Sequence, residues 1–536
     1  MSSSVRRSVA ALAATALVAP LLLASASPAS AQKGSQSDRA AQDAAALSRA
    51  LVRDASAKDA SKHLVALQAI ARATGGHRVA GSLGHDISAA YVQTLLTAAG
   101  YRVSSQKFDF IYTETLAEKL SAVSPTPFDA EIKALTYTKS TPAGGITAQL
   151  AAPPIDADGT TGCEPGDYAA GAFTGKIALI KRGGCAFGVK QEQAAAAGAA
   201  GAIIYNNIDA GYGPLSGTLG DPATVKIPTA GLSKPDGDRL AADLAQGPVT
   251  ISFEVRQLQE TRTTKNVIAE TRGGDAANTV VLGAHLDSVK AGPGINDNGS
   301  GSAGLLDVAL KLAKKEKQPR NKVRFAWWSA AESGLFGSAH YVDALPPAER
   351  QKIKLYLNFE NLASPNYGLF VFDGDNSDGL NFPAGPTGSA QIERDITTFL
   401  GDRGLPTAGT PFIGRSDYHP FVLAGIPSGG TFSGMEALKT PAEAAKWGGE
   451  AGVAFDVNYH AAGDTLKNIN TKAFDINIDV IANAVGTYAH DLGALKNPPA
   501  AGRQAAPAYV TGADAEADAR TDATTGTSTD TGTSSR

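Results

Sequence analysis

Five side chains in this sequence, each expected just past the end of a strand, are of the types that bind divalent metals: His285, Asp297, Glu332, Glu360 and His460. Two imidazoles and three carboxylates form a mixed nitrogen and oxygen set, which suits Zn²⁺ or another divalent first-row metal. A single catalytic zinc normally has three protein ligands and an open position. We therefore expect two metal ions that share a bridging carboxylate, a pair that can polarise a carbonyl group.

The stretch Thr279–Ser302 is expected to position the first two of these ligands. Its opening run, Thr279–Ala284, is apolar with β-branched residues, which predicts a strand buried on both faces of a parallel sheet. The run ends at His285, and a Gly-rich loop then leads to Asp297. Asp287 is placed to receive the second ring N–H of His285 and to fix its orientation. Taken alone, His285 could instead be a histidine without a ligand role in a polar loop between a strand and a helix.

Two further strands are expected to deliver carboxylates to the same place. Val323–Trp328 is an apolar run with Glu332 just after it, and Lys354–Phe359 is another that leads to Glu360. A closing helix is expected near Ile478–Leu492. This alternation of strands and helices predicts a doubly wound α/β fold with a mixed sheet and a site at the carboxyl edge of its strands.

The first half of the chain begins with helices and then changes character. Helical patterns occur at His63–Ala73 and Ser88–Ala99, and a strand pattern follows at Tyr101–Phe110. The next strand pattern of the same domain is at Lys265–Glu270, after the insert. Residues 32–60 form either a mobile lead-in or an N-terminal helix. The expected division of the chain is a signal peptide at 1–31, a lead-in at 32–60, one domain from 61–133 and 257–495, an inserted domain at 134–256 and a tail at 496–536.

Both ends of the chain are expected to lie outside the fold. Arg6 and Arg7 precede the apolar segment Val9–Ala24, and Ala29-Ser30-Ala31 is a cleavage pattern. Together they predict a secretory signal peptide, since a membrane anchor would need a longer apolar span. The tail is Ala-, Thr-, Ser- and Asp-rich and is expected to be disordered. We therefore expect a secreted, extracellular protein.

Charge and composition exclude two classes of binding partner, nucleic acids and membranes. The formal net charge is -4 and the hydrophobic fraction is 43%, so nothing indicates nucleic-acid binding or contact with a membrane after signal cleavage. The chain has 2 Cys residues, Cys163 and Cys185. In an exported protein an isolated pair is expected to form one disulfide, and two buried free thiols are the alternative.

The Gly-, Pro- and Ala-rich insert resembles the protease-associated (PA) domain. The resemblance rests on Cys163-Glu-Pro, on Gly175-Lys-Ile-Ala-Leu-Ile-Lys-Arg-Gly-Gly-Cys-Ala-Phe and on Gly201-Ala-Ile-Ile-Tyr-Asn-Asn. Such domains are usually lids or interaction modules, and they carry no catalytic residues. A generic α/β module that only packs against the rest of the chain is the alternative.

The remainder resembles the secreted zinc aminopeptidases of peptidase family M28, particularly the streptomycete type. The matching segments are Gly283-Ala-His-Leu-Asp-Ser, Gly294-Ile-Asn-Asp-Asn-Gly-Ser-Gly, Phe325-Ala-Trp-Trp, Tyr356-Leu-Asn-Phe, Gly414-Arg-Ser-Asp and Tyr459-His460 with Asp464-Thr465. The resemblance implies a sheet of zinc-exopeptidase type, two zinc ions per chain and a monomer. It also implies that the substrates are peptide or protein N-termini.

The resemblance also implies roles for individual residues. His285 and Glu360 would each bind one end of the zinc pair, Asp297 would bridge it, and Glu332 and His460 would complete the set. A cis peptide after Asp297 is a further expectation.

Two more residues receive roles in substrate handling. Tyr459 would donate a hydrogen bond to the developing oxyanion, and Arg415 would lie near the substrate carbonyl or the product carboxylate. The structural alternatives are a core aromatic for Tyr459 and a surface ion pair for Arg415.

The family pattern breaks at the expected proton acceptor. Family members carry two adjacent glutamates after the Trp-Trp strand, the first as general base and the second as ligand, whereas this chain has Ala331 followed by Glu332. The family's usual Asp is also replaced, by Glu360. Its longer side chain can still bind metal, but it would either shift the site or displace the substrate amino group.

Three interpretations follow from this break. The protein is an aminopeptidase with a substitute base such as Glu332, Glu360 or a water; or it is an impaired pseudo-peptidase that binds metal and peptides; or it performs other chemistry, such as carboxypeptidase action or glutaminyl cyclisation. The number of retained elements favours the aminopeptidase.

Overall fold

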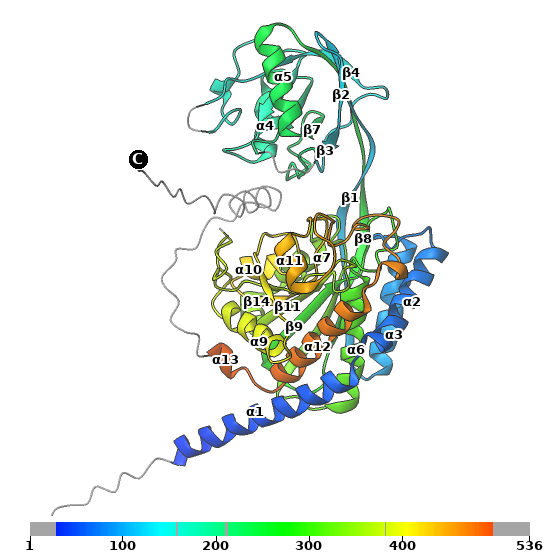
Figure 1. The fold of residues 1–536 in the computed structure, drawn as a ribbon, viewed down its shortest axis with the longest axis vertical. Coiled ribbons are helices and arrows are strands. Elements are labelled where there is room, and N and C mark those ends of the chain that lie inside the picture. Colours follow the sequence, from blue (N-terminus) through cyan, green and yellow to red (C-terminus); the bar gives the residue numbers. More distant parts are fainter. Residues whose placement is uncertain (1–27, 157–158, 209–212, 381, 497–536) are drawn as a thin grey trace, which may run out of the picture.

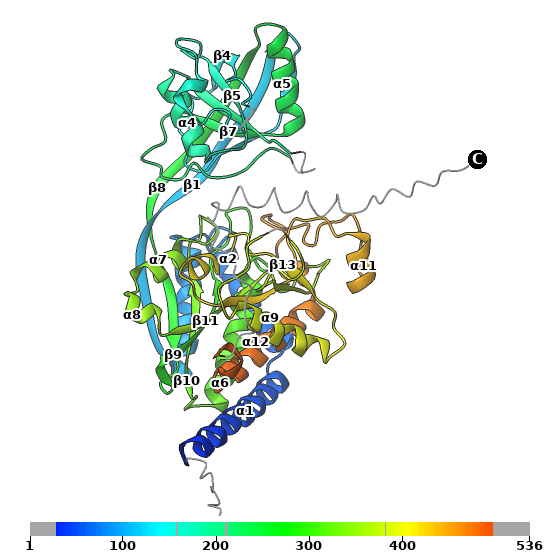
Figure 2. The same cartoon turned by 90° about the vertical axis from the view of Figure 1, so that its left-hand side faces the viewer.

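The computed structural model describes residues 28–156, 159–208, 213–380 and 382–496. The predicted signal peptide and C-terminal tail lie almost entirely outside the described residues. The chain forms two lobes, a larger one at the bottom of Figure 1 and a smaller one above it. Two long strands, β1 (Arg102–Ser124) and β8 (Thr250–Glu270), run from one lobe to the other (Figures 1 and 2).

These two strands form an antiparallel ribbon along their whole length, from the pair Arg102 and Glu270 to the pair Ser124 and Thr250. The sequence pattern predicted only the end of this ribbon in the larger lobe as strands, at Tyr101–Phe110 and Lys265–Glu270. Its middle pairs on one edge only and lies partly exposed, so the alternation of apolar and polar residues is weak there. The ribbon therefore belongs to both lobes.

The larger lobe is built on a mixed sheet with the strand order β13-β12-β14-β11-β9-β10-β8. Its central strands are parallel: β9 (Asp275–His285) lies between β10 (Asn321–Trp328) and β11 (Ile353–Glu360). The outer strands are β14 (Ser428–Phe432), β12 (Phe370–Phe372) and β13 (Ala408–Thr410). The apolar runs recognised in the sequence are these buried central strands, as predicted.

Helices cover both faces of this sheet. One face packs on α1 (Pro28–Asp54), α2 (Ala57–Ala73), α3 (Leu83–Ala98), α6 (Gly299–Lys315), α9 (Ser389–Gly401) and α12 (Thr471–Tyr488). The other packs on α7 (Phe336–Ala344) and α10 (His419–Leu423), with a cluster that includes Trp328, Tyr356 and Phe421. The shorter helices α8 (Pro347–Arg350), α11 (Pro441–Trp447) and α13 (Gly493–Lys496) lie at the periphery. This three-layer arrangement confirms the α/β class.

The lead-in is a helix rather than a mobile segment in its described part. Leu47 and Leu51 of α1 are buried in the main core, and α1 packs along α12. The helix ends at Asp54, and Ser56 then caps α2 by accepting the backbone N–H of Asp59 at 3.2 Å.

The smaller lobe is a separate α/β unit with its own core. Its strands follow the order β4 (Ile146–Ala151), β5 (Ile177–Lys181), β6 (Gly201–Tyr205), β7 (Thr229–Leu232) and β3 (Ile132–Ala134), with α4 (Phe187–Ala196) and α5 (Lys234–Gln246) packed on them. The short strand β2 (Phe128–Ala130) pairs with β1. Cys163 and Cys185 form a disulfide in this lobe, which confirms the predicted pairing.

Candidate metal centre

The predicted metal ligands meet at the carboxyl edge of the three central parallel strands. His285 is the last residue of β9, Glu360 is the last residue of β11, and Glu332 follows the end of β10 at Trp328. Trp328 and His285 are register partners in the sheet. Neighbouring parallel strands end side by side, which is why residues so far apart in sequence converge.

Asp297 lies between two imidazoles. Its Oδ1 is 3.5 Å from Nε2 of His285, and its Oδ2 is 3.2 Å from Nε2 of His460. His285 Nε2 is also 3.5 Å from Oε1 of Glu360, while His460 Nε2 is 3.0 Å from Oε2 of Glu332. The cluster thus has two ends, one with His285 and Glu360 and the other with His460 and Glu332. The resemblance had placed His285 and Glu360 at one end each, and the structure instead puts them together.

The donor set fits a divalent metal on two grounds. Oε1 of Glu332 is buried and has no hydrogen-bond partner among the described residues, as expected for an atom whose partner is an ion. Burial disfavours a proton on His285, but its contacts with Asp287, Asp297 and Glu360 raise the pKa of its ring well above the usual value. The surrounding carboxylates therefore favour a positive charge here, which bound cations would supply.

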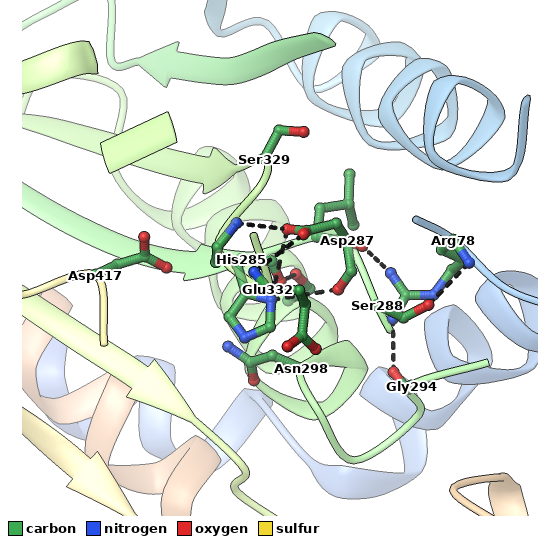
Figure 3. A network of polar contacts seen from close by, with 12 residues as sticks. Arg78, His285, Asp287, Ser288, Gly294, Asn298, Ser329, Glu332 and Asp417 are labelled. Atoms are coloured by element: carbon green, nitrogen blue, oxygen red, sulfur yellow. Dashed lines mark hydrogen bonds and ion pairs between the residues drawn. The ribbon is translucent and has the colours of Figure 1, made fainter. Parts of the chain in front are cut away.

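Asp287 connects two of these ligands. Nδ1 of His285 is 3.2 Å from the backbone oxygen of Asp287 and 3.7 Å from its carboxylate Oδ1, so the ring faces the main chain more closely than the expected side chain. The carboxylate instead accepts the backbone N–H groups of Ala331 at 3.2 Å and Glu332 at 3.3 Å. Figure 3 shows Asp287 in this position between His285 and the Glu332 segment.

A fully buried arginine holds the loop that joins His285 to Asp297. The side chain of Arg78 donates to the backbone oxygens of Leu286, of Pro293 at 2.9 Å and of Gly294 at 2.6 Å. Its backbone N–H also donates to Oγ of Ser288 at 2.8 Å (Figure 3). Burial lowers the pKa of Arg78 to about 10, so the group remains charged at neutral pH. Sequence reasoning missed this residue, because its acceptors lie more than two hundred positions away.

The far end of the same loop is fixed by Asp464. Its carboxylate accepts the backbone N–H of Asn296 at 2.7 Å and that of Asp297 at 2.9 Å. The bond between Asp297 and Asn298 is a cis peptide, as expected. The Asp464-Thr465 match in the sequence was a signal for this contact, although its role could not be read there.

Glu360 is held by polar side chains on the side away from His285. Its Oε2 accepts a hydrogen bond from Oγ of Ser416 and lies 3.4 Å from Nδ2 of Asn358. Asn358 also donates to Oγ of Ser416 at 2.6 Å. These contacts fix the longer carboxylate that replaces the family's Asp, and they leave Oε1 directed toward His285.

Arg415 and Tyr459 lie together beside the cluster. Nη2 of Arg415 is 3.5 Å from the Tyr459 hydroxyl, and Nη1 of Arg415 is paired with Oε1 of Glu436 at 2.8 Å. The Tyr459 ring stacks on the ring of His460, with 3.9 Å between centroids. Burial raises the pKa of Tyr459 well above its usual value, so its hydroxyl keeps the proton that it could donate. His460 has φ 54, a conformation that non-glycine residues rarely adopt outside functional sites.

Comparisons with known proteins identify both parts of the chain. The profile of peptidase family M28 matches residues 266–485, and that of the PA domain matches residues 146–240. Leucine aminopeptidase 2 of Trichophyton equinum is 46% identical over 429 residues, which cover 80% of this chain and 83% of that protein. The probable lipoprotein aminopeptidase LpqL of Mycobacterium tuberculosis is 43% identical over 440 residues, covering 82% and 86%.

Solved structures show the same architecture. The aminopeptidase from Aneurinibacillus sp. strain AM-1 superposes with a TM-score of 0.64 at 28% identity, covering 82% of this chain and 95% of that one. A zinc aminopeptidase from Bacillus subtilis gives 0.55 at 27% identity, covering 80% and 94%. The fold is thus that of a zinc exopeptidase with an inserted module. The chain belongs to peptidase family M28, and its smaller lobe is a PA domain.

Among the described residues, no helix is both long and apolar enough to span a membrane. The disulfide of the PA domain is of the kind that persists in oxidising compartments.

Proposed function

We propose that the protein is a metal-dependent aminopeptidase that removes N-terminal residues from peptides with a two-zinc site. The observation that carries the proposal is the position of Asp297, whose two carboxylate oxygens face different imidazoles. His285 and Glu360 would hold one ion, His460 and Glu332 the other, and Asp297 would bridge them. Bound zinc would act as a Lewis acid toward the carbonyl of the scissile bond.

The remaining residues would handle the substrate and the proton. The Tyr459 hydroxyl, which retains its proton, would donate to the oxygen of the reacting carbonyl, and Arg415 beside it would face the same oxygen or the product carboxylate. Glu360 would meet the substrate ammonium group. We assign the proton acceptor to Glu332 in addition to its role as a ligand, because Ala331 beside it has no side-chain group that can accept a proton.

Ala331 favours a second candidate, a pseudo-peptidase that binds metal and peptides with little turnover. General acid–base catalysis contributes about 10²–10⁴-fold, so a site without a working base would lose that much rate. The structure holds Ala331 through its backbone: its N–H donates to Asp287 and its oxygen accepts from Gly334 and Leu335. These contacts fix the segment but supply no side-chain acceptor. The two candidates share the metal site and differ only in turnover.

We also propose where the protein acts and how it is divided. The signal-peptide pattern and the disulfide support a secreted, extracellular protein. The family resemblance is the basis for proposing a monomer. The peptidase domain would comprise residues 61–133 and 257–495, and the PA insert residues 134–256. The strand β8 crosses the boundary between residues 256 and 257, and β1, which ends at Ser124, pairs with β8 along its whole length, so the two domains share this ribbon.

Purified mature protein tests the main proposal directly. Chelated protein should hydrolyse Leu-p-nitroanilide only after zinc is restored, and metal analysis should then find two ions per chain. His285→Ala should abolish both results. His490→Ala is the matched control, since His490 pairs with Glu316 away from the cluster and should leave both unchanged. Full activity in the chelated protein would overturn the proposal.

A further inference from the structure

The segment that carries Glu332 adopts an unfavourable backbone conformation. Ala330 has φ 58 and Leu335 has φ 60, and Gly334 between them has φ 128. Non-glycine residues with positive φ persist only where the surrounding structure enforces them. The position of Glu332 therefore depends on contacts that hold this segment from outside.

Two polar side chains supply part of that support. Oδ1 of Asn266, on β8, accepts the backbone N–H of Ser329 at 3.0 Å, and its Nδ2 donates to the backbone oxygen of Gly337 at 2.8 Å. Asn266 thus joins both ends of the segment to the ribbon. Asp287 accepts the N–H groups in the middle of the segment, from Ala331 and Glu332.

Phe336 supplies apolar support at the end of the segment. Its ring lies 5.9 Å from the ring of Phe110 on β1, between centroids. It packs against a cluster from the larger lobe and the ribbon that contains Val79, Ala80, Phe108, Phe110, Tyr112 and Ala330. It also packs against a cluster of the PA domain that contains Leu135, Tyr137, Phe187, Ile204, Leu215, Leu219 and Val225. Phe336 is therefore a point where the PA domain touches the peptidase segment that bears Glu332.

We propose that Phe336 is a positioning residue through which the PA domain and the ribbon fix Glu332 in the metal centre. Without its ring, the segment would lose the contact that keeps Leu335 and Ala330 in their left-handed conformations. Glu332 would then leave His460, whereas His285 and Glu360 would stay in place, because they end strands of the central sheet. The metal part of this proposal rests on the proposed two-zinc site.

Hydrogen–deuterium exchange tests the anchor without any metal. In Phe336→Ala, amides of the segment 329–337 should exchange at least about ten times faster than in the wild type, while amides of β9 and β11 keep their protection. Phe336→Leu should restore most of the protection, because it retains an apolar side chain. Unchanged exchange in the segment, or equal loss of protection in β9 and β11, would overturn the proposal.

Zinc titration tests the functional consequence. Phe336→Ala should bind one zinc with unchanged affinity and the second about 10–100-fold more weakly, in the range seen when support around a ligand is removed. Phe128→Ala is the matched control: Phe128 is a half-buried phenylalanine that packs on the PA core far from this segment. It should bind both ions as the wild type does.

The two measurements separate the proposals. If the wild type binds no zinc pair, the two-zinc function fails, and the exchange experiment still decides whether Phe336 holds the segment. Two tight zinc ions in Phe336→Ala, or weakened binding of both ions to the same extent, would overturn the role of Phe336 in placing Glu332.

Discussion

The carboxylate of Asp287 accepts a hydrogen bond from the backbone N–H of Glu332 at 3.3 Å. Asp287, two residues after the predicted ligand His285 at the end of β9, thereby holds the predicted ligand that follows β10. The same carboxylate also accepts the N–H of Ala331 at 3.2 Å. The break in the family pattern at Ala331 therefore leaves the backbone of this segment supported.

Asp287→Asn should weaken zinc binding by about 10–100-fold, the usual cost of disturbing a group that orients a ligand. An amide offers a single acceptor oxygen, so one of the two N–H groups would face an NH₂ group. Competition titration with a chromogenic chelator measures the effect. Asp402→Asn, at the exposed end of α9, is the control and should bind zinc normally. Wild-type affinity in Asp287→Asn would show that the two N–H contacts do not place Glu332.

Arg78→Lys should lower zinc affinity and activity together while the protein stays folded. The substitution keeps the positive charge but cannot reproduce the planar fork that reaches three backbone oxygens in the loop between His285 and Asp297. Titration calorimetry with zinc, beside circular dichroism, provides the readout. A different result would contradict this role: zinc binding by Arg78→Lys equal to that of the wild type, together with tighter binding by the uncharged Arg78→Met. Arg78 would then affect the site only through its positive charge.

Glu332→Ala should remove one zinc and all measurable turnover. Oε2 of Glu332 contacts His460, and its Oε1 has no hydrogen-bond partner among the described residues, as suits a metal ligand. Metal analysis of the dialysed variant is the measurement. Retention of two zinc ions with loss of activity would make Glu332 the base and not a ligand.

Glu393→Gln should make the protein more stable at alkaline pH. Burial, reinforced by the nearby Asp373, raises the pKa of Glu393 from 4.5 to about 7. Between these values the folded protein binds more protons than the unfolded chain, so this residue destabilises the fold as pH rises. The amide keeps an acceptor for the backbone N–H of Gly374, which Glu393 accepts at 2.8 Å.

The expected gain in melting temperature is about 1–2 °C at pH 8, and it should vanish below pH 4.5, where the carboxyl is neutral in both states. Scanning calorimetry across this pH range measures it. Glu450→Gln, an exposed substitution, should show no such trend. A gain for Glu393→Gln that is equal at pH 4 and pH 8 would refute the electrostatic explanation.

Sequence reasoning anticipated that the candidate ligands would lie together, because the patterns that indicate this are local. Each of His285, Glu332 and Glu360 follows a recognisable apolar run, and parallel strands bring such ends together. The same reasoning found the PA insert and the disulfide, which rest on local motifs. These parts of the fold needed only short-range patterns and one rule of topology.

The supports of the site could not be read in this way. Arg78 contacts carbonyls rather than recognisable partner side chains, and Phe336 resembles any helix residue that faces a core. The ribbon of β1 and β8 extends well beyond the strand patterns, because its pairing is exposed on one edge and leaves little hydrophobic periodicity. Such contacts depend on tertiary structure, which single-sequence patterns do not encode.

The most direct test compares the turnover of Leu-p-nitroanilide by the wild type, Ala331→Glu and Glu332→Ala, each with and without zinc. If the protein is an aminopeptidase, wild-type turnover should depend on zinc and exceed that of Glu332→Ala. Ala331→Glu should then raise kcat by up to about 10²–10⁴-fold, the contribution of a dedicated general base. The contradicting result would be that the wild type turns over substrate no faster than Glu332→Ala, while Ala331→Glu is active. The protein would then be a metal-binding member of the family without catalytic function.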